Sequence, residues 1–180
     1  MKKSFIIIIM VLLLAACTSQ DSHKSYKSVI ELDDLKFEVE DYEIRSSNNP
    51  DDKNVQVFVK KAIHYQFSLL NTGIEKIGSD NIDDEKLEVY IEAHENLLDF
   101  MEPNLFETNK SNMRSGSGSG SQQTYLNPNE KGEYFFTYII ADIKDLELIK
   151  ENALDADIVV LLTNSSGISE EIKRITLNKK

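Results

Sequence analysis

The chain has very little cysteine and no tryptophan. Of its 180 residues, Cys17 is the one that carries a thiol. A lone thiol can form neither a disulfide within the chain nor a thiolate metal site, so the folded part must be stabilised by packing. The missing tryptophan also excludes the paired-cysteine and tryptophan core of antibody domains.

Positive charge is scarce as well. The chain carries 20 lysines and arginines against 31 aspartates and glutamates, which gives a formal net charge of −11. A surface this acidic repels the phosphates of nucleic acids, so we expect no nucleic-acid partner. It also repels anionic lipid headgroups, so attachment to a membrane through a basic patch is not expected.

Long apolar runs are confined to the N-terminus. Residues 5–14 are all apolar, and they stand between Lys2 and Lys3 on one side and Ala15 and Ala16 on the other. A positive segment, an apolar segment and small residues, in that order, are typical of a secretory signal peptide. The twelve residues from Phe5 to Ala16 would span about 18 Å as a helix, well short of a hydrocarbon core of about 30 Å. We therefore predict a signal peptide and not a retained transmembrane helix.

The end of this segment, Leu14-Ala15-Ala16-Cys17, resembles the lipobox of bacterial lipoproteins. The resemblance implies cleavage between Ala16 and Cys17 and a diacylglycerol on the sulfur of Cys17; acylation of the new amino group, for example by palmitate, stays open. Two acyl chains are enough for a stable membrane anchor. We thus expect a signal peptide at 1–16, a lipidated polar tether at 17–28, and a location on the extracytoplasmic face of the bacterial cell membrane.

The rest of the chain is dominated by patterns of period two, which indicate half-buried β-strands. The clearest run is Ile63, Tyr65, Phe67 and Leu69, which alternate with His64, Gln66 and Ser68. In the first strand the alternation slips after Glu40, which predicts a bulge or a bend at Glu40-Asp41. Residues 87–101 fit both a strand and a helix, and the Val-Tyr-Ile cluster favours a strand for 86–93. Further strands are expected at 35–39, 55–59, 134–140, 158–162 and 172–177.

One helix and one long loop complete this pattern. Ile143, Leu146, Ile149 and Ala153 have helical spacing and predict a short crossover helix. Residues 107–124 hold few apolar side chains and include alternating serine and glycine, so we expect a mobile loop there. Seven or eight strands with one crossover helix predict an all-β fold, an antiparallel β-sandwich over residues 29–180.

Two segments resemble the immunoglobulin-like domains of small Gram-positive lipoproteins of unknown function. The first is the strand ending Phe67-Ser68-Leu69-Leu70-Asn71-Thr72-Gly73, and the second is Leu126-Asn127-Pro128-Asn129-Glu130-Lys131-Gly132-Glu133 before an aromatic strand. The second departs from the usual turn, with Asn129 in place of glycine and Gly132 displaced. The resemblance implies an immunoglobulin-like sandwich, and it implies no catalytic residue.

Residues for chemistry are few and scattered. His23, His64 and His94 show no metal-ligand spacing, and neither a nucleophile elbow nor a phosphate-binding loop occurs. The acidic clusters lack the calcium-loop spacing, although calcium and a carboxylate pair for glycoside hydrolysis stay open. These clusters are Asp33-Asp34, Asp51-Asp52, Asp80 with Asp83-Asp84-Glu85, and Asp155 with Asp157. We expect no cofactor, no metal site and no catalytic residue.

The aromatic run at 134–138 has apolar side chains on both faces, with Phe135 opposite Tyr134 and Phe136. It fits either a strand buried on both sides or a strand with an exposed aromatic face, and we predict burial.

Three functions fit this sequence. A non-enzymatic binding or protein-interaction module agrees best with a tethered sandwich. A cell-wall-acting enzyme or enzyme accessory is the alternative, and a structural envelope protein is the third. A cleft with converging carboxylates would favour the enzyme.

The lipobox gives the first testable prediction. Replacing the thiol in Cys17→Ala should block lipid transfer and the cleavage that depends on it, because the thioether cannot form. Fractionation of cells should then show uncleaved precursor or released protein. A Cys17→Ala protein of mature size that stays with the membranes would contradict the lipobox interpretation.

Overall fold

The computed structural model describes Tyr26 and residues 29–45, 55–81, 83–102, 118–121, 123–141 and 145–178, without the side chains of 118–121. The predicted signal peptide, Cys17 and most of the tether lie outside the described residues, as does most of the 107–124 loop. Within the described part, no helix is both long enough and apolar enough to cross a membrane.

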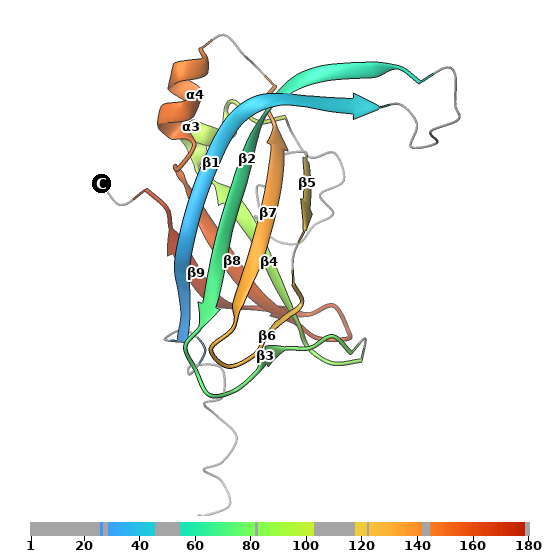
Figure 1. Ribbon diagram of the computed structural model, residues 1–180, viewed down its shortest axis with the longest axis vertical. Coiled ribbons are helices and arrows are strands. Elements are labelled where there is room, and N and C mark those ends of the chain that lie inside the picture. Colours follow the sequence, from blue (N-terminus) through green and yellow to red (C-terminus); the bar gives the residue numbers. More distant parts are fainter. Residues whose placement is uncertain are drawn as a thin grey trace, which may run out of the picture.

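Two antiparallel sheets form the body of the molecule (Figure 1). The four-stranded sheet has the order β1-β2-β7-β5 and the three-stranded sheet the order β4-β8-β9, with a small β3-β6 ribbon beside them. The four-stranded sheet consists of β1 (Ile30–Arg45), β2 (Val57–Asn71), β7 (Lys131–Ile139) and β5 (Gly118–Ser121). The other elements are β3 (Ile77–Gly78), β4 (Lys86–Ala93), α3 (Glu95–Leu98), β6 (Tyr125–Leu126), α4 (Leu146–Asn152), β8 (Ala156–Thr163) and β9 (Ser169–Thr176).

This strand order matches the immunoglobulin constant-type arrangement. In chain order, β1, β2, β4, β5, β7, β8 and β9 take the places of strands A to G, so the sheets correspond to ABED and CFG. The predicted immunoglobulin-like sandwich is therefore confirmed. The strand predicted at 86–93 is confirmed as well, because it is β4.

The core lies between the two sheets and follows the alternation of β2. Ile63, Tyr65, Phe67 and Leu69 are at most 1% exposed, whereas His64, Gln66 and Ser68 lie on the outer face, as predicted. The Phe67 ring stacks on Tyr134 of β7, with ring centroids 5.4 Å apart. The opposite sheet contributes its own inward row. That row is Leu87, Val89 and Ile91 of β4 with Ile158, Val160 and Leu162 of β8.

The strand that is buried on both faces is β8, and the prediction of two-sided burial for the aromatic run was wrong. Phe135 of β7 is 42% exposed on the outer face. In register it is flanked by Gln66 of β2 and by Ser121 of β5. On β8, by contrast, Val159 is paired with Tyr90 and Arg174, two long side chains on the flanking strands.

The crossover helix is α4, between β7 and β8, as predicted. The side chain of Asp145 caps its N-terminus by accepting a hydrogen bond from the Leu148 amide at 3.0 Å. Ile149 and Ala153 are fully buried. The buried Tyr65 hydroxyl donates to the carbonyl of Ala153 at 2.6 Å, which ties the end of α4 to β2.

The two segments of the immunoglobulin-like resemblance contact each other. The buried Asn71 side chain donates to the carbonyl of Leu126 at 3.2 Å, and the Asn129 amide donates to the carbonyl of Asn71 at 2.7 Å. Asn129 has a φ of 58°, so asparagine occupies the left-handed position where glycine is usual. A Cβ on Gly132 would lie 2.5 Å from Cδ2 of Leu126, so this close approach requires glycine.

The first strand has its bulge elsewhere than at Glu40-Asp41, although its later part does bend, which was the other predicted possibility. The register of β1 against β2 shifts between Leu32 and Asp34 and is continuous at Glu40-Asp41. The apolar alternation slips after Glu40 for another reason, because the sandwich ends there. Glu40 is paired with Ala62, and β2 pairs with β7 only from Ala62 onwards. Beyond that point residues 41–45 and 57–61 form a two-stranded ribbon, here called the arm. Figure 1 shows that the arm bends over the end of the sandwich opposite Ile30.

Residues 118–121 are a strand, although their composition predicted a loop. Backbone pairing runs from Gly118 opposite Tyr138 to Ser121 opposite Phe135. The free edge of β7 supplies the hydrogen bonds, and glycine is tolerated because this is the outermost strand of the sheet.

The core assignment predicts a sharp difference between two neighbouring residues. Phe67→Ala should lower the free energy of unfolding by about 3 to 5 kcal/mol, because it empties a fully buried site between the sheets. Gln66→Ala is the matched control and should change it by less than about 0.5 kcal/mol, because Gln66 is exposed. Urea unfolding of residues 18–180 measures both variants. Equal small losses would show that this row is not packed.

Candidate functional site

The structure separates the residues singled out in the sequence. Cys17, Ala16, His23 and Asp51-Asp52 lie outside the described residues. His64 lies on the outer face of the four-stranded sheet, and His94 lies at the start of α3 beside the other sheet. The two described histidines therefore belong to two separate polar constellations.

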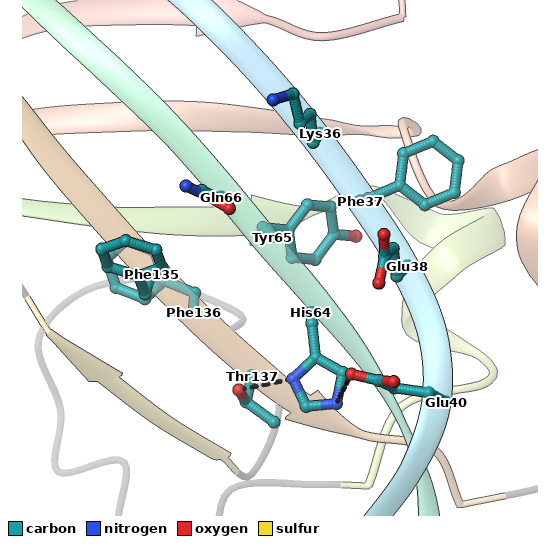
Figure 2. Close-up of a pocket in the computed structure, with 10 residues that line it drawn as sticks. All are labelled: Lys36, Phe37, Glu38, Glu40, His64, Tyr65, Gln66, Phe135, Phe136 and Thr137. Atoms are coloured by element: carbon teal, nitrogen blue, oxygen red, sulfur yellow. Dashed lines mark hydrogen bonds and ion pairs between the residues drawn. The ribbon is translucent and has the colours of Figure 1, made fainter.

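The first constellation surrounds a groove on the outer face of the four-stranded sheet (Figure 2). Register places Glu38, His64 and Thr137 in one row across β1, β2 and β7, and Lys36, Gln66 and Phe135 in the next. Because the period of a strand is two, the alternation that buries Phe67 necessarily turns these side chains outward. They border a cavity of about 270 Å³, with Glu40 at one end.

His64 occupies the middle of the groove. Its Nδ1 lies 2.9 Å from Oγ1 of Thr137, within hydrogen-bond distance. Its Nε2 lies 3.8 Å from Oε1 of Glu40, which is too long for a hydrogen bond. Nε2 is buried and has no hydrogen-bond partner among the described residues. The Tyr42 ring lies close to the imidazole, with 5.9 Å between the two ring centroids.

The groups beside His64 are available for recognition. In the part of the chain that the structure describes, Lys36, Glu38 and Gln66 make no side-chain hydrogen bond or ion pair. Phe135 adds an exposed aromatic ring beside them. The groove thus offers a cation, two carboxylates, an amide and an apolar ring on one rigid surface.

Binding suits this arrangement better than catalysis. Glycoside hydrolysis needs a carboxylic acid and a carboxylate on opposite sides of the bond that breaks. Glu38 and Glu40 instead project from one face of a single strand, β1, and so stand on the same side of the groove.

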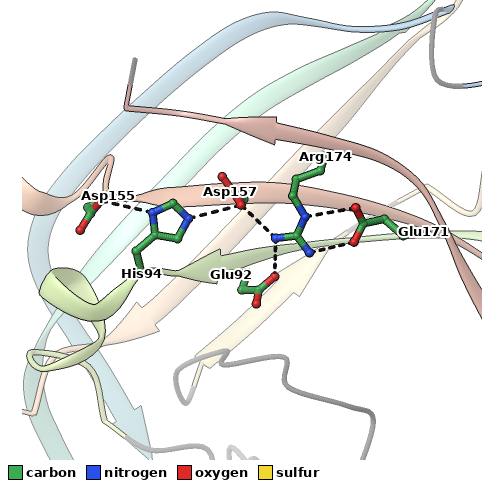
Figure 3. Close-up of polar contacts among 6 residues, drawn as sticks. All are labelled: Glu92, His94, Asp155, Asp157, Glu171 and Arg174. Carbon is green, nitrogen blue, oxygen red and sulfur yellow. Dashed lines mark hydrogen bonds and ion pairs between the residues drawn. The ribbon is translucent and has the colours of Figure 1, made fainter. Parts of the chain in front are cut away.

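The second constellation lies on the outer face of the three-stranded sheet and is centred on His94 (Figure 3). Ala93 is paired with Ala156, which brings His94 between Asp155 and Asp157. The His94 Nδ1 lies 3.2 Å from Asp155 Oδ1, and its Nε2 lies 3.3 Å from Asp157 Oδ2.

Arg174 of β9 extends this network across the sheet. Its NH1 donates to Asp157 Oδ2 at 2.9 Å and to Glu92 Oε2 at 2.7 Å. Its Nε and NH2 donate to the two carboxylate oxygens of Glu171, at 3.1 and 2.8 Å. One guanidinium therefore joins β4, β8 and β9.

The pKa shifts in this network favour ions. Burial lowers the pKa of His94, but the hydrogen bonds and charges of Asp157 and Asp155 outweigh it and raise the pKa overall. Burial raises the pKa of Asp157, but the hydrogen bonds from Arg174 and His94 outweigh it, so this pKa is lowered. Both shifts favour the charged form of each partner, which is typical of a structural ion network and not of a proton-transfer site.

The described residues contain no arrangement of side chains suited to binding a metal ion. No group of three or more histidines, cysteines, aspartates or glutamates among these residues is placed to hold a metal ion. Several acids of the predicted clusters are paired instead. Asp33 forms an ion pair with Lys131 at 2.6 Å, Asp80 pairs with Lys76 at 3.3 Å, and Asp84 accepts from Ser79 at 3.1 Å.

Sequence reasoning missed most of both constellations. It placed His64 and Gln66 on an outer face but gave no partner from β1 or β7, because register across strands is not visible in one sequence. The alternation of residues along 134–138 did predict that Phe135 lies on the same face of its strand as Thr137. Nothing in the sequence indicated that His94 meets Asp155 and Asp157, about sixty residues away along the chain.

Comparison of the chain with protein-family models, with curated proteins and with solved structures gives no match. The argument for function therefore depends on the geometry of the described surfaces and on the N-terminal sequence.

The His94 network predicts a pH dependence of stability. A pKa raised on folding means that His94 contributes stability below about pH 6.5, its unfolded value, and that this contribution is lost as the pH rises through the folded value. His94→Gln removes it, so the difference in free energy of unfolding between wild type and variant should be larger at pH 5.5 than at pH 9.

Urea unfolding of residues 18–180 at several pH values measures this difference, and an NMR titration of the imidazole locates the pKa of His94 directly. The effect should be small, within the range of about 1 kcal/mol for partly exposed ion pairs. A titration midpoint at or below 6.5, or a difference that grows with pH, would contradict the assignment.

Proposed function

We propose that this chain is a bacterial lipoprotein, held on the extracytoplasmic face of the cell membrane by lipid on Cys17. In this proposal its immunoglobulin-like domain is a non-enzymatic module that binds another protein. The signal-peptide pattern and the lipobox support the location. Cleavage would remove Lys2 and Lys3 and leave a net charge of −13, so the lipid and not a basic patch would hold the protein at the membrane.

The observation that carries the binding role is the outer face of the four-stranded sheet. From the groove to the arm, this face presents Phe135, Tyr42 and Phe58, and Phe58 is 52% exposed. Lys36, Glu38 and Gln66, which form no side-chain hydrogen bond or ion pair with the described residues, lie among them. Exposed aromatic side chains surrounded by polar groups are typical of protein interfaces, where aromatic residues provide much of the binding energy.

The groove is small, with a volume of about 270 Å³. A space of this size accepts one or two side chains of a partner. An enzyme or accessory acting on the cell wall has less support, because the two carboxylates stand side by side.

The position of the arm agrees with a role at a distance from the membrane. The tether would enter at Ile30, and β1 then runs through sixteen residues to Arg45, about 50 Å of extended chain. Figure 1 places the arm at the far end of the sandwich from Ile30. A partner could reach the arm without approaching the lipid surface.

A photo-crosslinking amino acid tests the binding role in cells that make the protein. Placed at Phe135, it should form specific crosslinks to another protein, because the proposed interface covers this ring. Leu148 on α4 is the matched control, since it is 41% exposed against 42% for Phe135. Crosslinks at both positions with equal yield, or at neither position, would contradict an interface on the four-stranded sheet.

A further inference from the structure

Two carboxylates and one cation, Lys36, line the groove from β1, so its charge is negative on balance. Glu38 and Glu40 project from the same face of β1, and Glu38 has no ion-pair partner in the part of the chain that the structure describes. The molecule as a whole is strongly acidic, with a net charge of −11 before cleavage. Both the local and the overall charge therefore attract a positively charged group and repel an acidic one.

His64 and Glu40 leave a gap of a specific size. Nε2 of His64 and Oε1 of Glu40 are 3.8 Å apart. Nε2 has no hydrogen-bond partner among the residues that the structure describes. A charged nitrogen placed about 2.8 Å from each atom would donate a hydrogen bond to both. This requires the proton of the imidazole on Nδ1, which can then donate to Oγ1 of Thr137. Glu40 is 60% exposed and can move to admit such a group.

An apolar contact lies within the same groove. Phe135 and Gln66 occupy the row next to that of His64 and Thr137, two residues away on each of the two antiparallel strands. Side chains that alternate along an extended segment reach the same face at every second residue. One extended segment can therefore place a cation at Glu38 and Glu40 and an apolar side chain on Phe135.

We propose that the groove binds an extended segment of a partner protein that carries a lysine or arginine two residues away from an apolar residue, so that both side chains face the groove. Glu38, Glu40 and Nε2 of His64 accept hydrogen bonds from the cation, Gln66 hydrogen-bonds the backbone of the segment, and Phe135 packs on the apolar side chain. The inference rests on the proposed binding function and adds the chemistry of the partner.

A labelled synthetic peptide tests the inference on the full-length acylated protein in uncharged detergent. The probe is an N-acetylated heptapeptide with one lysine and one phenylalanine two residues apart and serine at the other positions, so that both side chains face the groove. Its binding is followed by fluorescence anisotropy. The salt is about 0.15 M, where long-range attraction is largely screened. A second peptide has norleucine in place of lysine, which keeps the length of the side chain and removes the charge. The lysine peptide should bind at least about tenfold more tightly than the norleucine peptide.

Matched double variants locate the binding. Glu38→Gln with Glu40→Gln should weaken binding of the lysine peptide by at least about tenfold. Glu95→Gln with Glu151→Gln removes the same charge from exposed positions on α3 and α4 and should weaken it less than about twofold. Equal losses for both double variants would overturn the proposal, because they would indicate general attraction to an acidic surface. Absence of binding at about 1 mM peptide would overturn it as well.

Phe135→Ala tests the apolar contact by a double-mutant cycle. A peptide with alanine in place of phenylalanine should bind wild type more weakly, and Phe135→Ala should abolish the difference between the two peptides. A difference that persists in Phe135→Ala would overturn this part of the proposal. Thermal unfolding of each variant confirms that the fold is retained.

The outcomes distinguish this inference from the proposed function. Crosslinking at Phe135 in cells that survives the Glu38→Gln and Glu40→Gln changes would keep the interface and overturn the cationic partner. Failure of crosslinking at Phe135 would overturn the proposed function itself.

Discussion

The structure depends on one constraint, that β2 must bury every second side chain between two neighbouring strands. Phe67 and Tyr65 satisfy it by facing the three-stranded sheet, and the same alternation turns His64 and Gln66 outward. A shift of one residue would bury the polar row and expose the aromatic one. Because β1 and β7 both pair with β2, their outward side chains are aligned with His64, so the packing of the core also assembles the groove.

The outer faces of the two sheets differ in how their polar groups are satisfied. On the three-stranded sheet, Arg174 and His94 bind the surrounding carboxylates, and Val159 of β8 is buried between the flanking side chains. The charged groups of that face thus pair with one another, although two of its buried oxygens, Oδ1 of Asp157 and the Tyr90 hydroxyl, have no hydrogen-bond partner among the described residues. On the four-stranded sheet, Glu38 has no partner among the described residues and Phe135 is exposed. Polar groups without partners and an exposed ring are available to bind another molecule. We therefore assign the proposed function to the outer face of the four-stranded sheet.

The sequence was sufficient wherever the period of the chain and the packing agree. The strand through Phe67, the strand at 86–93 and the helix α4 were predicted because burial imposes their periodicity. The sequence was insufficient where the structure or exposure of a residue depends on a neighbouring strand. Residues 118–121 have the composition of a loop, but they pair with the free edge of β7. Phe135 was predicted to be buried, but its neighbour on that edge is Ser121 of β5. The contact of His94 with Asp157 depends on the β4–β8 register, which local sequence does not encode.

The central claim is that another molecule covers the outer face of the four-stranded sheet when the protein is at work. Carboxylate footprinting tests this most directly, by labelling glutamates in intact cells and in the purified protein and comparing the two by mass spectrometry. Glu38 and Glu40 should be labelled several times less in cells than in the purified protein, because the partner shields them. Glu95 and Glu151, exposed on the helices, should be labelled equally in both. Equal labelling of all four glutamates in both samples would contradict the account.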